Sequence, residues 1–160
     1  MFVCSVRAST IRFSLLIALM LAVLVTVIAF GTGQSVAVFK DGETYRFTGV
    51  KDAEDRVAFL SQFGIEVKDE GVSEESFTMP DTLDRVLLGY NEIQKRQGLD
   101  LSKYQGKKVT RYIYEVKNGD YEGTTLVNLI VCRGRVVAAD VSGRNPDSFV
   151  IPLTEFAKTT

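Results

Sequence analysis

The chain of 160 residues carries 19 Lys and Arg against 20 Asp and Glu, and it contains no His and no Trp. Only two charged residues, Arg7 and Arg12, precede position 31, and the remaining net charge of −3 argues against a nucleic-acid-binding protein, which needs a concentrated basic face. The absence of His excludes Ser-His and Cys-His catalytic arrangements and every His-metal site.

The first predicted element is an apolar helix. The segment from Phe13 to Phe30 contains no charged residue, no Gly and no Pro. As a helix it would rise about 27 Å, close to the roughly 30 Å hydrocarbon core of a bilayer. A buried core helix normally keeps a polar stripe, whereas Ser14 and Thr26 are the only polar residues here. We therefore predict a transmembrane helix over residues 13–33 that acts as a signal anchor.

The flanking charges predict the orientation of this helix. Arg7 and Arg12 lie on its N-terminal side, and no basic residue follows it before Lys40. By the positive-inside rule, residues 1–12 are then cytoplasmic and the C-terminal part is extracytoplasmic. This gives a single-pass protein of the plasma membrane with its N-terminus inside and its C-terminal domain outside.

A cleaved signal peptide is the alternative to a retained anchor. Ala29-Phe30-Gly31 has the small-x-small spacing of a cleavage site. Signal peptides usually have an apolar region of about 7–15 residues. The longer apolar region of this chain favours retention.

Residues 34–47 form a juxtamembrane segment or a β-hairpin, in which 36–39 and 44–47 would pair across an Asp41-Gly42 turn. Residues 48–160 form the extracytoplasmic domain. It begins with a helix over 53–63, with Asp52 as N-cap and Gly64 at its C-terminus.

A short strand at 65–67, a solvated acidic loop at 69–75 and an extended piece at 77–79 follow this helix. A second helix is predicted from the cap residue Asp81 to Gly98, with Asp84 in its first turn, and a loop around Leu101 and Tyr104 comes after it.

The C-terminal half of this domain has the alternation of β-strands. Strands are predicted at 108–116, 125–132 and 135–141, and the last two pair across Arg133-Gly134. Helices followed by an antiparallel meander predict an α+β domain, with two helices and an antiparallel sheet after the N-terminal transmembrane helix.

Few residues are candidates for chemistry. The sequence contains no phosphate-binding loop, nucleophile elbow or zinc motif, and we expect no catalytic residue, metal or cofactor. Cys4 and Cys132 lie on opposite sides of the predicted membrane span and form no disulfide, and Cys132 fits a small buried hydrophobe. Asp140 interrupts an apolar strand, as an outward-facing residue or as a buried acid held by Arg111 or Arg135.

Two polar groups are candidates for interaction. On the second helix, Tyr90, Asn91, Gln94 and Gln97 share one side. These amides either satisfy backbone groups of the loop 100–104 or line a polar groove for a peptide or glycan. Nearby basic residues either protect an edge strand from association or form a patch for an anionic lipid or polymer. They are Lys103, Lys107, Lys108 and Arg111.

The segment from Tyr90 to Val116, YNEIQKRQGLDLSKYQGKKVTRYIYEV, resembles a bacterial family known as domain of unknown function 4830. Arg56, Phe59-Leu60 and Phe63-Gly64 are similar to the family's upstream helix, so the likeness covers most of residues 48–142. The resemblance implies a small protein of the bacterial cell envelope with one N-terminal membrane span. It implies no activity.

We therefore expect a membrane-anchored, non-enzymatic binding or regulatory module that contacts an unknown envelope protein or polymer and no nucleic acid. One alternative is a cell-wall hydrolase that uses carboxylates, with Asp140 and a Glu as candidates. Another is a structural subunit of a membrane complex, although the span lacks a GxxxG motif.

An alkaline phosphatase fused after Thr160 tests this topology. Because the enzyme folds only in an oxidising compartment, we expect an active fusion in the membrane fraction. Activity in the soluble exported fraction would indicate a cleaved signal peptide. A stably expressed but inactive fusion would reverse the orientation.

Overall fold

The chain divides into two units, Met1–Gln34 and Ser35–Thr160. The computed structural model describes residues 19–21, 36–38, 44–68, 71–118, 124–145 and 149–157. Residues 19–21 of the predicted transmembrane helix are helical, and the rest of that helix lies outside the described residues, as does segment 1–12. No helix within these described ranges has the length and apolar character needed to cross a membrane.

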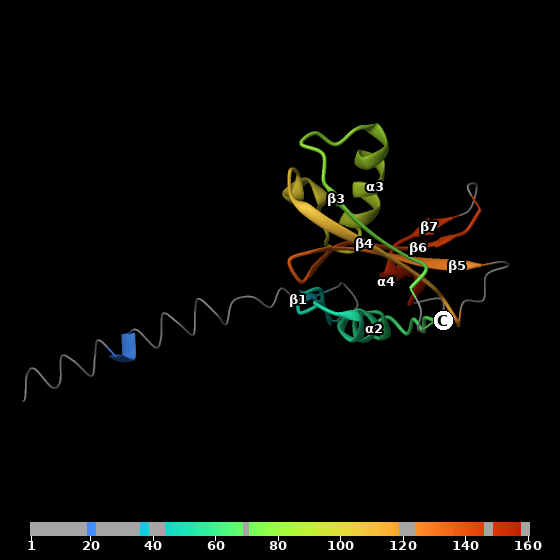
Figure 1. Cartoon of the computed structure of the whole chain (residues 1–160), viewed down its shortest axis with the longest axis horizontal. Helices are drawn as coiled ribbons and strands as arrows, with labels where there is room; N and C mark the ends of the chain where they lie inside the picture. The colour runs from blue at the N-terminus through green and yellow to red at the C-terminus, as the bar shows by residue number, and fades with distance from the viewer. Residues whose placement is uncertain are drawn as a thin grey trace, which may run out of the picture. The chain divides into compact units, whose positions relative to one another are not determined.

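The second unit is built on a five-stranded antiparallel sheet with the order β3-β4-β5-β6-β7, shown in Figure 1. The strands are β3 (Ser73–Thr78), β4 (Lys108–Glu115), β5 (Thr125–Cys132), β6 (Arg135–Gly143) and β7 (Val150–Ile151). Neighbours in the sheet are also neighbours in the chain, so the sheet is a meander. The predicted α+β class is confirmed for this unit.

Helices lie on both faces of the sheet (Figure 1). Helices α2 (Ala53–Ser61) and α4 (Leu153–Phe156) share one core with β5 residues such as Leu129. Helix α3 (Arg85–Lys95) and the 3-10 helix η1 (Leu101–Tyr104) border a second core that contains Ile130, the next residue of β5. Successive residues of a strand face opposite sides, so the apolar run of β5 supplies both cores.

The N-terminal part of this unit agrees with the predicted hairpin. Strand β1 (Val36–Val38) pairs antiparallel with β2 (Thr44–Arg46) in a separate two-stranded sheet. Helix α2 begins after Asp52, which forms a capping box with Asp55, so the predicted N-cap is confirmed. Gly64 follows the helix with a φ of +69°, as its position in the sequence indicated.

Helix α3 begins later than predicted. Its N-cap is Asp84, whose carboxylate accepts a hydrogen bond from the Leu87 N–H at 2.8 Å, and the predicted cap Asp81 lies outside the helix. Asp81 lies against Gly106 instead, where an added Cβ would come within 2.8 Å of its carboxylate oxygen. Leu83 is buried in the α3-side core and holds the intervening residues against the sheet.

Two predictions between α2 and α3 were wrong. Residues 73–75 belong to β3 and not to an acidic loop, because β3 is an edge strand whose exposed side chains tolerate Glu. Residues 65–67 form no strand beyond the isolated bridge from Val67 to Val116. The short elements η1, β7 and α4 were not predicted.

Candidate functional site

Three amide side chains of the α3 region lie in the interior of the domain. Asn91, Gln94 and Gln97 are 2%, 0% and 0% exposed. They are spaced three residues apart, which places them on one side of the helix. A buried amide must find hydrogen-bond partners inside the protein, and the partners of these three show how α3 is attached.

Asn91 holds the loop that follows the helix. Its Oδ1 accepts a hydrogen bond from the Leu101 N–H at 2.7 Å, and its Nδ2 donates to the Asp100 carboxylate at 3.0 Å. Asp100 also accepts from the Ser102 side chain, and these hydrogen bonds lower its pKa to about 2. Asn91 therefore satisfies the loop 100–104, which was one of the two predicted roles for these amides.

Gln94 and Gln97 bind the edge of β6 instead. The Ala139 N–H donates to Gln94 Oε1 at 2.8 Å, and Gln97 Nε2 donates to the Ala139 carbonyl. In the described part of the chain β7 pairs with Val141 and Ser142, and these amides occupy the edge of β6 on the far side of Val141, where β7 has ended. The sequence predicted that Gln94 and Gln97 would either satisfy the loop 100–104 or line a polar groove. Their hydrogen bonds to β6 differ from both predictions.

Gln97 also takes the place of a residue pair that is missing from the hydrogen-bond ladder between β6 and β7. The register that pairs Val141 with Ile151 would pair Ala139 with Leu153. Pro152 has no N–H, and the chain turns into α4 at Leu153. The Leu153 N–H donates to Gln97 Oε1 at 3.1 Å, so the amide stands between two strand partners and hydrogen-bonds to each.

The attachment of α3 creates a cavity of about 350 Å³ between the helix and the sheet, here called the α3 cavity. It is lined by residues from α3 and from all five strands. Its apolar lining consists of Phe77, Val86, Leu87, Ile130 and Val150, and its polar lining of Tyr90, Arg111, Asn128, Asp140 and Ser142. Tyr90 and Arg111 are the two predicted interaction residues that the structure brings together here.

Asp140 is the buried acid of this cavity, with 3% of its surface exposed. The Tyr90 hydroxyl donates to one carboxylate oxygen, and Asn128 Nδ2 donates to the other at 2.9 Å. Burial raises the pKa of Asp140, because the charged form is desolvated, although these two hydrogen bonds and the nearby Arg111 charge oppose the shift. Burial and the adjacent acid also raise the pKa of Tyr90 well above its ordinary value.

The predicted basic residues make different contacts. Arg111 Nη2 forms a 2.6 Å ion pair with Glu75 on β3, beside the cavity. Lys107 Nζ lies 4.9 Å from the centre of the Tyr104 ring, and Lys103 forms an ion pair with Asp100. Lys107 and Lys108 are exposed and do not line the α3 cavity.

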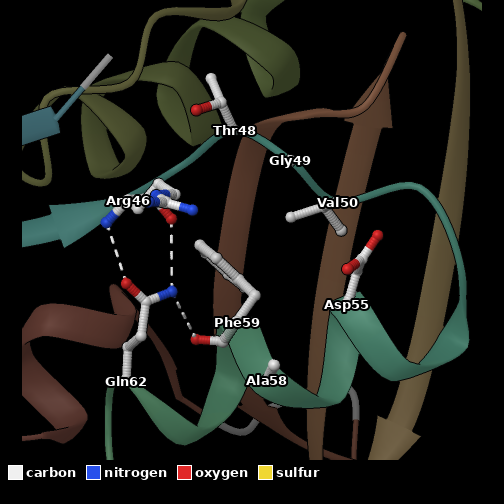
Figure 2. Close-up of a pocket in the computed structure, with 8 residues that line it drawn as sticks. All are labelled: Arg46, Thr48, Gly49, Val50, Asp55, Ala58, Phe59 and Gln62. Carbon is white, nitrogen blue, oxygen red and sulfur yellow. Dashed lines mark hydrogen bonds between the residues drawn. The ribbon is translucent and has the colours of Figure 1, made fainter. Parts of the chain in front are cut away.

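A second cavity, of about 250 Å³, lies between α2 and the segment that follows β2 (Figure 2). The Gln62 amide accepts from the Arg46 N–H and donates to the carbonyls of Arg46 and Phe59, as the dashed lines in Figure 2 show. The Asp55 carboxylate accepts from the Lys51 N–H at 2.8 Å. The main polar groups of this cavity are already hydrogen-bonded to the backbone. It is therefore a weaker candidate for a ligand site than the α3 cavity.

A third cavity, of about 370 Å³, lies between α2 and β3 on the opposite face of the sheet from α3, here called the α2 cavity. Arg56 is stacked over the ring of Tyr112 at 3.8 Å and donates to the Tyr114 hydroxyl at 2.6 Å. Ser73 and Glu74 form its border on β3, and Val72 lies just before that strand.

Potential metal ligands do not cluster in the parts of the chain that the structure describes. No group of three or more Cys, Asp or Glu residues there is arranged to hold a metal ion. Cys132 is buried, and its thiol donates to the Lys108 carbonyl over 3.6 Å. This placement suits a packing residue.

A protein-family model described as domain of unknown function (DUF4830) matches residues 59–141, just over half of the chain. The chain belongs to this family. The DUF4830 match confirms the resemblance seen in the sequence and includes every polar residue of the α3 cavity except Ser142. No curated protein and no solved structure matches the chain.

Several cavity residues were not identified from the sequence. Asn128 and Ser142 lie on β5 and β6, where their polar side chains alternate with buried apolar neighbours. That alternation was available in the sequence and places Ser142 on the face of Asp140. Asn128 comes opposite Asp140 only because the β5–β6 register shifts between Ile130 and Val131, an irregularity that local sequence does not reveal. The contributions of Phe77 and Val86 depend on where α3 packs, which local sequence does not determine.

Exchanging each glutamine for glutamate tests the edge pairing of Gln94 and Gln97. Gln97 Nε2 donates two hydrogen bonds, whereas Gln94 Nε2 has no partner among the described residues. We expect Gln97→Glu to lower the free energy of unfolding by about 1–3 kcal/mol more than Gln94→Glu, measured by urea denaturation. Both variants bury a carboxyl group, so that cost cancels. An equal or reversed order would contradict the pairing.

Asp140 should make stability depend on pH in a defined direction. Its pKa is raised above 3.8 in the folded state, so the folded protein holds this proton more tightly than the unfolded chain. The stabilisation is complete below 3.8 and is lost as the pH rises through the folded pKa. Relative to Asp140→Asn, the free energy of unfolding should fall as the pH rises from about 4 through the folded pKa, by at most about 1.4 kcal/mol per pH unit.

Urea denaturation of both proteins across this range gives the measurement. The lowered pKa of Asp100 acts on both proteins equally and cancels. A difference that is constant or that rises with pH would show that burial does not dominate the environment of Asp140.

Proposed function

We propose that this protein is a membrane-anchored, extracytoplasmic binding module of the bacterial cell envelope, without enzymatic activity, and that the α3 cavity is its recognition site. The observation that carries the proposal is the arrangement of Asp140. Among the described residues that line the cavity, Asp140 is the single carboxyl group, and one of its oxygens accepts from Tyr90 and the other from Asn128.

Such an arrangement supports binding more than hydrolysis. A glycosidase needs two carboxyl groups about 5–9.5 Å apart on either side of the scissile bond. The described residues that line the α3 cavity include no second acid, and the hydrogen bonds of Asp140 hold it in one orientation. A fixed polar floor with apolar walls is typical of a site that orients a ligand.

The exposed residues around the cavity also favour a partner. Val86 is 78% exposed on α3, and the exposed Val150 lies on the β7 side of the same cavity. Arg111 adds a cation beside them. Apolar side chains that surround a cavity with a few polar groups are typical of an interaction surface.

The predicted anchor would determine where this surface acts. A single N-terminal span with Arg7 and Arg12 on its inner side would hold the domain at the outer face of the plasma membrane. The partner is then an envelope protein or polymer within reach of that face.

Site-specific photo-crosslinking of the full chain in membranes tests the proposed site. A photoreactive residue at position 86 lies at the cavity, whereas one at position 88 is on the same helix, is 52% exposed and does not line the cavity. We expect a discrete adduct from Val86 and none from Leu88. No adduct from Val86, or equal adducts from both, would contradict the proposed site.

The hydrolase alternative has its own test. Purified full-length protein should release no fragments from cell-wall material. Release that is abolished by Asp140→Asn would overturn the non-enzymatic proposal.

A further inference from the structure

The outer edge of β3 is the longest exposed strand edge of the described domain. β3 is the last strand on its side of the sheet and has six residues, Ser73–Thr78, of which only Phe77 is partly buried. At the other end of the sheet, β7 has two residues, and the edge of β6 beside it is occupied by Gln94 and Gln97. Side-chain amides therefore cover backbone groups at the β6–β7 end of the sheet, whereas the β3 end is exposed.

The hydrogen-bond pattern determines which backbone groups of β3 point outward. Met79 donates its N–H to the Lys107 carbonyl, on the β4 side of the strand. Alternate residues of an antiparallel strand point their N–H and C=O to opposite sides. Glu74, Ser76 and Thr78 therefore direct these groups away from β4, at the free edge.

This edge is bordered by a cavity on each face of the sheet. Phe77 lines the α3 cavity, and Ser73 and Glu74 line the α2 cavity. Because side chains of a strand alternate between faces, a strand added along β3 would direct its side chains in turn toward the α3 and the α2 sides. The position opposite Phe77 suits an apolar side chain, beside Val86 and Leu87.

The acidic charge of the β3 edge favours a basic partner. Glu74 and Glu75 are adjacent and exposed, and they face opposite sides of the sheet. Glu74 would pair with a basic side chain on an added strand, and Glu75, which already pairs with Arg111, would share its carboxylate with a second cation. A second copy of β3 would place acidic residues close to acidic residues, which is unfavourable across strands.

We propose that β3 binds an extended basic segment of a partner polypeptide as an additional antiparallel strand, with an apolar side chain opposite Phe77 and basic side chains opposite Glu75 and Glu74. Strand addition of this kind draws affinity from the backbone and specificity from alternate side chains. The inference rests on the proposed binding function and names its partner class, because Phe77 belongs to the α3 cavity.

A designed peptide tests the pairing without altering the protein. The probe is a dye-labelled hexapeptide, Thr-Leu-Thr-Lys-Lys-Thr, whose leucine lies opposite Phe77 and whose central threonine lies opposite Ser76 in the antiparallel alignment. Binding to the full chain in uncharged detergent micelles is followed by fluorescence anisotropy. We expect saturable binding below about 1 mM.

Methylation of single peptide nitrogens provides the matched control. The N–H of the central threonine would donate to the Ser76 carbonyl, whereas the N–H of the leucine would point away from β3. Methylating the threonine nitrogen should weaken binding at least about tenfold, and methylating the leucine nitrogen should change it less than about twofold. Replacing both lysines by glutamate should abolish binding.

A protein variant gives an independent measurement. Ser76→Pro removes the outward N–H while leaving the β3–β4 hydrogen bonds, and Ser76→Ala removes only the hydroxyl contact with Thr110. We expect tenfold weaker binding for the first and unchanged binding for the second, with circular dichroism confirming that both fold.

Three results would overturn the inference. They are the absence of saturable binding at about 1 mM, equal effects of the two methylations, and a dimer of the full chain that the peptide dissociates, which would make a second copy the occupant. If the Val86 adduct persists in any of these cases, the edge inference falls alone. If that adduct is absent, the proposed function falls whether or not the peptide binds.

Discussion

Primary amide side chains hydrogen-bond to the backbone at the points where regular structure stops in this domain. Gln97 stands between Ala139 and Leu153, where the β6–β7 ladder would have continued. Gln62 pairs with both the N–H and the C=O of Arg46 (Figure 2). A side-chain amide has the same donor and acceptor as a peptide group, so it can replace one strand residue in a ladder. Without it, each buried backbone group would lose a hydrogen bond at a cost of about 1–3 kcal/mol.

This constraint positions the α3 cavity. Because Gln94 and Gln97 bind the backbone of β6 and Asn91 binds the loop after α3, the helix is held at its C-terminal half in one rotation about its axis. That rotation places the Tyr90 hydroxyl on the Asp140 carboxylate and leaves Val86, one turn earlier, exposed at the cavity. The polar floor and the apolar walls of the site are therefore consequences of how the helix is attached.

The sequence was informative where local patterns decide the structure. Alternation and the Arg133-Gly134 turn predicted β5 and the start of β6 correctly, because both residues of that turn adopt positive φ. The sequence was less informative where tertiary contacts decide the structure. The residues 73–75 read as an acidic loop because pairing with β4, and not their own propensity, makes them a strand. Tyr90 and Arg111 could be named as candidates from the sequence, but their meeting at Asp140 depends on the register of three strands, β4, β5 and β6, and on the packing of α3.

The two edges of the sheet show a difference that bears on function. Open strand edges promote association, and proteins usually cover or charge them. Here one edge is covered where β7 ends. Gln94 and Gln97 hydrogen-bond to the N–H and C=O of Ala139 on β6, and Gln97 also accepts from Leu153 at the turn into α4. The other edge, β3, has no further strand beside it among the described residues, and it carries Glu74 and Glu75. Those acids repel a second copy of the same edge and attract a basic strand, so the charge that protects β3 from self-association also selects what it would accept.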